Sequence, residues 1–314
     1  MKKKRTVLWV AIVAVVLFVL GGGSCMLVGL VAALGASVEG GGDAVALVEV
    51  EGIIASGDAA DYASGMALTG QVIGDIEQAL ADDSIRAIVL YVNSPGGTVV
   101  ASAEMYETLV ECSKPIVTSM GEVAASGGYY IACGTEYIMA HPATIVGSIG
   151  VIAQYRNAEE LLDKLGIQTQ VIKSGARKDH GGWHRPLSPD EVAMHQVMID
   201  QAYDDFVDVV VKGREMDEDR VRELADGSVY SGHQAVAHRL VDASGNLDDA
   251  IATAAQMGGI EGEPRIVRYP HEPSFFDVLS GYLMRASQPE ELILLEELLG
   301  VGQVPKIQYL YVGP

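Results

Sequence analysis

The chain has 314 residues, enough for one large domain or two ordinary ones, and it can bury a substantial core. Its 42 Asp and Glu residues outnumber its 21 Lys and Arg residues, giving a formal net charge of −21 at pH 7. A surface this acidic repels phosphate backbones, so the composition excludes nucleic acid as a partner.

The first 38 residues predict a membrane segment. MKKKR opens the chain, and no charged residue follows it up to Val38. A membrane-spanning helix needs about 20 apolar residues, and the basic flank predicts a cytoplasmic N-terminus with the remaining chain extracytoplasmic. Two alternatives stay open: a signal peptide cleaved near residues 35–37, and lipid attachment at Cys25. An uncleaved single-pass anchor in the cell membrane is the favoured interpretation.

Beyond a glycine-rich linker at 39–43, predicted strands and helices alternate. Strands are expected at 44–54, 85–93, 114–120, 136–140, 144–154 and 169–175. Helices are expected at 70–83, 102–113, 158–167, 188–214 and 217–227, with a strand, turn and helix at 240–259. The alternation predicts parallel pairing with right-handed crossover helices, an α/β layered fold. We expect one domain over 44–260 and a C-terminal extension at 261–314.

The cysteines and histidines predict neither a metal site nor a disulfide framework. Cys25 lies in the membrane segment, which leaves Cys112 and Cys133 as a single candidate pair. No spacing resembles a zinc site, and no phosphate-binding glycine loop is present. We therefore expect no metal and no cofactor.

The stretch EVAASGGYYIACG at 122–134 surrounds one hydroxyl, that of Ser126, with the smallest residues. Close backbone packing would explain this, and so would a nucleophile kept open to a substrate carbonyl. Ligands of parallel α/β sheets bind beyond the carboxyl ends of the strands, where SPGG (94–97) and Ser126 are both expected. Unshielded N–H groups of Gly97 and Gly127 would together form an oxyanion hole, although SPGG alone would be read as an ordinary turn.

A serine nucleophile needs a base, and no acid–histidine pair is obvious in the chain. A lysine can serve, because burial lowers the pKa of an amine by about 3–5 units from its ordinary value of about 10.4. Lys173 and Lys178 flank the predicted strand-to-loop junction SGARKD. Three other lysines are expected to be solvated: Lys114, Lys164 and Lys212. These considerations alone do not decide between Lys173 and Lys178.

Four motifs follow one another along the chain: VNSPGG (92–97), SMGEVAASGGYYIA (119–132), TIVGSIGVI (144–152) and IKSGARKD (172–179). Together they resemble the bacterial signal peptide peptidases of the SppA type, in the wider Clp-protease/crotonase superfamily. The resemblance covers about 44–250 and extends to the N-terminal anchor. It implies a Clp-protease/crotonase-like layered fold with parallel sheets and crossover helices, preceded by one transmembrane helix.

The resemblance also implies roles for individual residues. Ser126 matches the nucleophile, Lys178 the general base, and Ser148 a second serine that orients the lysine amine. Gly97 matches an oxyanion donor, and the amide of Gly127 is added by analogy with related serine peptidases. Lys173 is then expected at the surface. Because a nearby carboxylate would keep Lys178 charged, the side chain of Asp179 is predicted to point away from it.

The implied function is a membrane-anchored Ser/Lys endopeptidase that degrades hydrophobic signal peptide remnants in or at the membrane. A ring-like homo-oligomer is also implied, in which the serine of one subunit meets the lysine of its neighbour. Two alternatives are a catalytically silent scaffold that binds membrane peptides and a crotonase-type acyl-CoA enzyme. Three segments of the C-terminal extension match no motif: FFDVLSGYLM (275–284), EELILLEELLG (290–300) and PKIQYLYVGP (305–314). They are expected to cover a subunit interface; alternatively, IQYLY acts as a bound peptide near the active site.

Overall fold

The computed structural model describes residues 42–57, 65–270 and 308–311. The predicted membrane anchor at 1–38 lies outside these residues. Within them, no helix combines the length and apolar character needed to cross a membrane.

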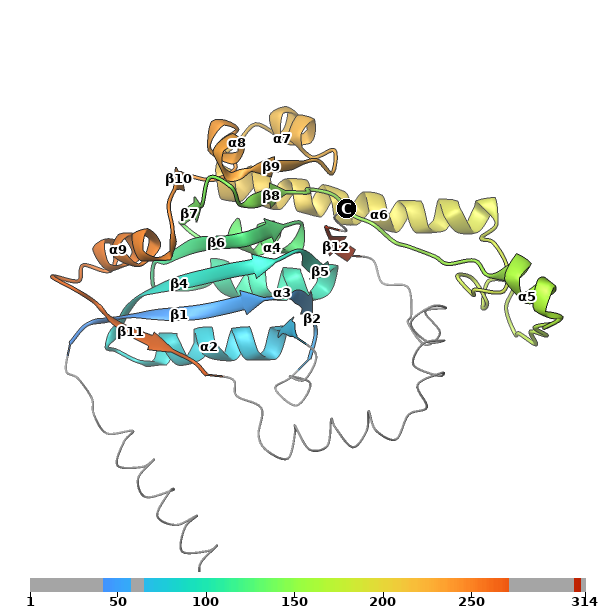
Figure 1. Ribbon diagram of the computed structural model, residues 1–314, viewed down its shortest axis with the longest axis horizontal. Coiled ribbons are helices and arrows are strands. Elements are labelled where there is room, and N and C mark those ends of the chain that lie inside the picture. Colours follow the sequence, from blue (N-terminus) through green and yellow to red (C-terminus); the bar gives the residue numbers. More distant parts are fainter. Residues whose placement is uncertain (1–41, 58–64, 271–307, 312–314) are drawn as a thin grey trace, which may run out of the picture. The chain divides into compact units, whose positions relative to one another are not determined.

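The central sheet is mostly parallel and has the strand order β10-β7-β6-β4-β1-β11 (Figure 1). Its strands are β1 (Ala44–Glu51), β4 (Ile85–Ser94), β6 (Ile116–Ala125), β7 (Tyr137–Ala140), β10 (Ala243–Ser244) and β11 (Arg265–Arg268). Two further strands, β8 (Ile145–Gly147) and β9 (Val229–Ser231), extend it beside the end of β6. A second, smaller sheet has the order β12-β5-β2-β3, with β2 (Ile53–Ala55), β3 (Met66–Leu68), β5 (Gly96–Thr98) and β12 (Gln308–Leu310).

Helices cover both faces of the central sheet, as the nearly continuous apolar sequence of β1 requires. Val45 and Leu47 belong to one buried cluster with α9 (Leu247–Met257), whereas Ala46 and Val48 belong to another. The second cluster includes side chains of α2 (Thr69–Ala81), α3 (Val99–Val110) and α4 (Gly127–Ala132). Successive strand residues thus face opposite layers, which confirms the predicted layered α/β fold with parallel strands.

The longest helix, α6 (Pro189–Arg214), begins at the capping box formed by Ser188 and Glu191. Its second half packs on the body of the fold through buried residues such as Ala202 and Phe206. The first half continues away from the sheets, beside a segment that contains α5 (Glu159–Leu165; Figure 1). We call residues 155–201 the arm. The remaining helices are α7 (Glu218–Leu224) and α8 (Gly232–Ala237).

Two predicted strands differ most from the structure. The strand expected at 169–175 is wrong: this stretch is irregular and exposed, and Ile172 is 94% exposed. The strand expected at 144–154 ends at Gly147, because Gly147 (φ 91°) and Ser148 (φ 50°) both leave the extended conformation. Beyond them, Ile152 forms only an isolated bridge to Gln308.

Candidate active site

Ser126 lies at the junction of β6 and α4, in a backbone conformation that few non-glycine residues adopt. Its φ of 53° and ψ of −118° must be held by the surrounding contacts. The amide of Ser126 donates to the carbonyl of Gly147 (2.7 Å), and the amide of Tyr130 donates to the carbonyl of Ser126 (2.8 Å). A serine on a strained strand-to-helix turn has the local geometry of a nucleophile elbow.

Ser148 occupies the equivalent place on the neighbouring strand. Ala125 of β6 pairs with Gly147 of β8 in parallel register, so Ser126 and Ser148 each follow a paired residue. Parallel neighbours lie about 4.8 Å apart, and the two serines therefore leave the sheet side by side. Ser148 also has a positive φ, and its amide donates to the carbonyl of Ser228 (2.8 Å).

The two candidate oxyanion donors lie close together. A Cβ atom added to Gly127 would lie 3.0 Å from the amide nitrogen of Gly97, and one added to Gly96 would lie 2.6 Å from the amide nitrogen of Gly127. Only glycine allows backbones to approach this closely. The small residues next to Ser126 therefore fit both explanations of the motif, close backbone packing and an accessible nucleophile. They permit the backbones to pack closely, and they leave the N–H groups of Gly97 and Gly127 near one point.

Two buried serines that the motifs did not single out support this arrangement. The hydroxyl of Ser94 donates to the carbonyl of Gly52 (2.6 Å) and accepts from the amide of Gly96 (3.0 Å). The hydroxyl of Ser102 donates to the carbonyl of Thr98 (3.0 Å). These bonds fasten the turn before β5 and the start of α3, on which the position of the Gly97 amide depends. Ser94 is the first residue of SPGG, whereas Ser102 has no sequence signal beyond its nearness to that motif.

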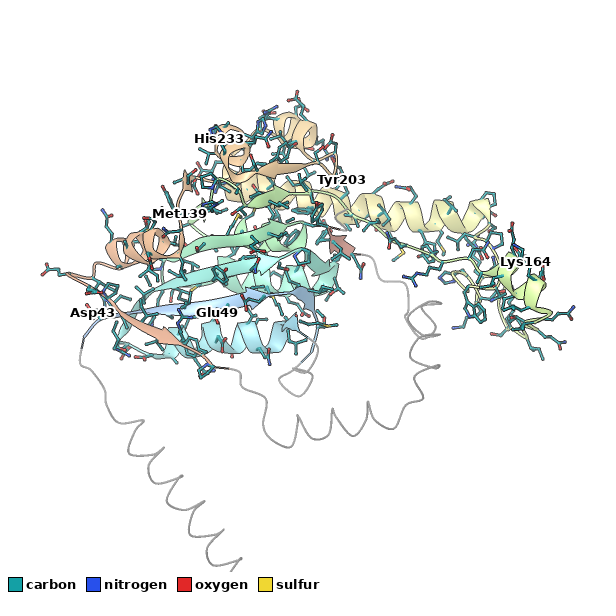
Figure 2. All side chains as sticks on the ribbon, in the orientation of Figure 1. Asp43, Glu49, Met139, Lys164, Tyr203 and His233 are labelled. Atoms are coloured by element: carbon teal, nitrogen blue, oxygen red, sulfur yellow. The ribbon has the colours of Figure 1, made fainter. Side chains whose placement is uncertain are left out.

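Lys178 lies on the arm and is exposed, whereas the other four candidates lie together at the sheet edge. Its loop is attached to the first turns of α6, where Arg185 binds Glu191. A helix rises 1.5 Å per residue, which separates Glu191 from Ala202 by about 16 Å along the axis. Figure 2 likewise shows Lys164 on α5 out on the arm, with Tyr203 on the part of α6 near the body. Within one chain, the structure does not bring Lys178 to Ser126.

The carboxylate of Asp179 binds two cationic side chains, and Lys178 is not one of them. It accepts from Lys173 (2.7 Å) and Arg185 (2.8 Å), in line with the prediction that it points away from Lys178. Arg185 also binds both oxygens of Glu191 (2.7 and 2.9 Å). Hydrogen bonds from Arg185 and then Lys173 hold the pKa of Asp179 well below its usual range. Hydrogen bonds from Arg185 and then the Ser188 amide lower the pKa of Glu191 to about 2.

Arg185 is therefore expected to hold the Lys178 loop in place, since one guanidinium spans two carboxylates. In Arg185→Ala, trypsin should cut at Arg177 or Lys178 about tenfold faster, because local opening becomes easier. Both carboxyl groups are ionised at neutral pH. Their stabilising contribution is complete above their ordinary pKa values, 3.8 and 4.5, and is lost as the pH falls towards 2.

The control for this experiment is Arg220→Ala, which removes an exposed arginine paired with exposed Glu223. Cleavage is followed by mass spectrometry at pH 7.5. Equal rates at the loop in Arg185→Ala and the parent would contradict the anchoring role.

The cysteines and the potential metal ligands are the remaining groups of side chains considered in the sequence. Cys112 and Cys133 are both free, and burial raises the pKa of the Cys133 thiol to about 12, which suppresses the reactive thiolate. Among the described residues, no group of His, Cys, Asp and Glu side chains is arranged to hold a metal ion.

A strained serine, a second serine and two glycine amides at one sheet edge form the arrangement expected of a hydrolase of the serine type. Residues 108–261 match Peptidase family S49, and residues 52–148 match Clp protease. A putative protease of Synechocystis sp. is 40% identical over 219 residues, which cover 69% of this chain and 75% of the relative.

Two further relatives cover more of this chain. A putative signal peptide peptidase SppA of Enterococcus faecium is 37% identical over 244 residues, covering 74% of this chain and 70% of the relative. Protease 4 of Salmonella typhi is 33% identical over 257 residues, covering 80% of this chain and 41% of the relative. The chain belongs to peptidase family S49 and is a serine peptidase, which sets it apart from the acyl-CoA enzymes considered above.

Proposed function

We propose that this peptidase is a membrane-anchored endopeptidase that degrades signal peptide remnants, with Ser126 as nucleophile and Lys178 of a neighbouring copy as base. The observation that carries the proposal is the strained Ser126 beside the Gly97 and Gly127 amides. The anchor at 1–38 is inferred from its apolar composition. The substrate class is suggested by the relative named signal peptide peptidase and by the inferred place of the enzyme at the membrane.

The proposed reaction is a two-step acyl transfer. The Ser126 hydroxyl adds to the substrate carbonyl carbon while its proton passes to the neutral Lys178 amine, and the Gly97 and Gly127 N–H groups stabilise the oxyanion. As the C–N bond breaks, Lys178 returns the proton to the leaving amine. Water, deprotonated by Lys178, then hydrolyses the acyl ester and regenerates Ser126. Ser148 is assigned the role of orienting the lysine amine.

The exposure of Lys178 supports a dyad formed between subunits. A lysine acts as a base only in its neutral form, and burial is what favours that form. In a single chain Lys178 is exposed. The arm that carries it also exposes many large apolar side chains: Leu161, Leu165, Ile167, Val171, Ile172, Val192, Val197 and Met198. Apolar side chains gathered in this way mark an interaction surface, and a neighbouring copy seated there would bury both the apolar residues and Lys178.

Complementation between two inactive variants tests this proposal. Ser126→Ala and Lys178→Ala should each lower kcat by at least about 10³-fold on a fluorogenic peptide. Co-expressed with different tags and purified through both, they should recover up to about a quarter of the parent activity, because one random interface in four joins an intact serine to an intact lysine.

Matched controls distinguish an incorrect dyad from a dyad that does not form between subunits. Lys164→Ala removes another exposed lysine of the arm and should keep the parent activity. Ser126→Ala combined with the double variant Ser126→Ala/Lys178→Ala should stay inactive. Activity in either single variant would rule out the dyad, and no recovery in verified mixed assemblies would rule out its formation between subunits. A parent chain that binds the peptide but never cleaves it would favour the silent scaffold instead.

A further inference from the structure

A cavity of about 550 Å³ lies beside Ser148, the serine assigned to orient the base. Val151, Ile152 and Tyr203 form apolar parts of its wall. Apolar walls suit the methylene stem of a lysine or arginine, and they favour the neutral form of a buried amine. Of the described residues that line the cavity, Asp226 alone carries a charge. A basic side chain that enters this cavity therefore meets Asp226.

Asp226 is held next to Ser148 by the backbone. The Ser148 amide donates to the carbonyl of Ser228 (2.8 Å), and the Gly227 amide donates to the carbonyl of Ile149 (3.1 Å). The Asp226 carboxylate accepts from the amide of Ser228 (2.9 Å), which fixes the turn. Hydrogen bonding to Ser228 lowers the pKa of Asp226, so the carboxylate is ionised at neutral pH. A carboxylate has about four acceptor sites, which leaves this one able to bind a guanidinium as well.

Arg177 immediately precedes Lys178, and both residues are exposed. Their loop is shaped by backbone hydrogen bonds from Lys178 to Gly175 (3.1 Å) and from His180 to Arg177 (3.2 Å). The carboxylate of Asp179 in the same loop is bound by other cations. Within the described residues, the guanidinium of Arg177 has no hydrogen-bond or ionic partner. The loop thus presents an uncompensated positive charge directly beside the proposed base.

The proposed dyad brings this loop to the cavity, because Lys178 of one copy has to reach Ser126 and Ser148 of its neighbour. Consecutive Cα atoms lie about 3.8 Å apart, so Arg177 arrives at the same place. We infer that Arg177 of the incoming loop forms an ion pair with Asp226 of the receiving copy, and that this pair positions Lys178 at Ser148. The inference rests on the proposed function, because it takes Lys178 as a base supplied by a second copy.

The ion pair also has an electrostatic consequence for the base. A carboxylate within about 4–6 Å of an amine favours the charged amine, so an unpaired Asp226 would hold Lys178 in its inactive, protonated form. The guanidinium of an arginine keeps its charge at every working pH and forms bidentate pairs with carboxylates. Arg177 therefore docks the loop and also compensates the one carboxylate that would otherwise oppose deprotonation of Lys178.

Charge reversal tests the ion pair. Arg177→Asp and Asp226→Arg should each lower kcat/KM on a fluorogenic peptide at least about tenfold, because each sets like charges opposite one another. Both changes in one chain restore an ion pair at every interface, and kcat/KM should return to within about threefold of the parent value. Arg177→Asp combined with Asp83→Arg has the same net charge but adds the cation at a distant exposed turn, and it should not recover. Full activity in Arg177→Asp, or equal recovery with Asp83→Arg, would overturn the pair.

The pH profile supplies a readout that remains if Asp226→Arg fails to fold. Arg177→Ala should move the alkaline limb of kcat/KM to higher pH by about one unit, because Asp226 is no longer compensated. Arg177→Ala/Asp226→Asn should move the limb back, since asparagine keeps an acceptor for the Ser228 amide without the charge. A limb that stays displaced in the double variant would overturn the pair. The other titratable or charged side chains that would face Lys178 or its loop are the same in both variants: Tyr203 and Tyr311 of the cavity, and Lys173, Asp179, His180 and Arg185 of the arm.

Zero-length cross-linking detects the contact without requiring activity. A carbodiimide joins an amine to a carboxylate that touches it, so the full-length variant Ser126→Ala/Arg177→Lys/Lys178→Ala should give chains linked through residues 177 and 226, as mapped by mass spectrometry. The same variant with Asp226→Asn is the control and should lack this link. A parent chain that cleaves peptides while the link is absent would overturn the inference. If the link forms but the parent chain never cleaves peptides, the proposed function fails while the docking contact stands.

Discussion

Replacing Ser126 with alanine is expected to abolish peptide cleavage, lowering kcat/KM by at least about 10³-fold. Ser126 is the residue that the structure holds at φ 53° between β6 and α4, and alanine has no oxygen to attack a carbonyl. Steady-state kinetics on a fluorogenic apolar peptide measure the loss. Binding of the same peptide should be retained, because the glycine amides are untouched.

The matched control is Ser119→Ala, which removes another buried serine hydroxyl from the same strand, well before the site. It should change kcat/KM by less than about threefold, as expected for a substitution remote from the chemistry. Ser126→Ala protein that folds correctly and still cleaves at more than about a tenth of the parent rate would remove Ser126 from the mechanism.

Gly127→Ala should lower kcat by about 10²–10³-fold, the usual cost of losing one oxyanion donor. The added Cβ would lie 2.6 Å from the Ser102 hydroxyl oxygen and 3.0 Å from the Gly97 amide nitrogen, so one side of the oxyanion hole has to shift. KM should change little, because an oxyanion donor acts mainly in the transition state. The measurement is a comparison of kcat and KM on one peptide.

Gly74→Ala provides the control, because it makes the same chemical change inside a helix. Gly74 lies in α2 with nothing within 4 Å of the added Cβ. Alanine should therefore leave kcat unchanged and stabilise the fold by up to about 1 kcal/mol. If Gly127→Ala also kept the parent kcat, the Gly127 amide would have no part in stabilising the oxyanion.

The positions of SPGG and Ser126 at one edge of the sheet could be predicted from the sequence, because the signals for strand ends are local. Apolar strands that stop at SPGG and before Ser126 place both loops beyond the carboxyl ends of β4 and β6. The rule that parallel strands carry their ligands at this edge then brings Gly97 and Ser126 together. The strained φ of Ser126 was not predictable, since it depends on the pairing of β6 with β8.

The position of the arm could not be read from the sequence in the same way, and that of β12 was open between a subunit interface and the active site. The apolar residues of 169–175 predicted a strand, but a strand forms only where another strand offers its edge, and within the described chain none does so here. Tyr309 lies over 170 residues from Tyr130, and their stacking is a tertiary contact without a local signal. Ser94 and Ser102 likewise gain their importance only from the backbone groups that folding brings to them.

The pairing of Ala125 with Gly147 is the last pair of the ladder between β6 and β8, and each serine follows one of these two residues. Side chains alternate between the two faces of a sheet, so slipping either strand by one residue would turn its serine to the opposite face. If one inserted residue caused such a slip, the sequence motifs around Ser126 and Ser148 would remain intact. The two hydroxyl groups, however, would no longer be neighbours. The length of chain inside these strands is therefore as much a part of the proposed catalytic apparatus as the serines themselves.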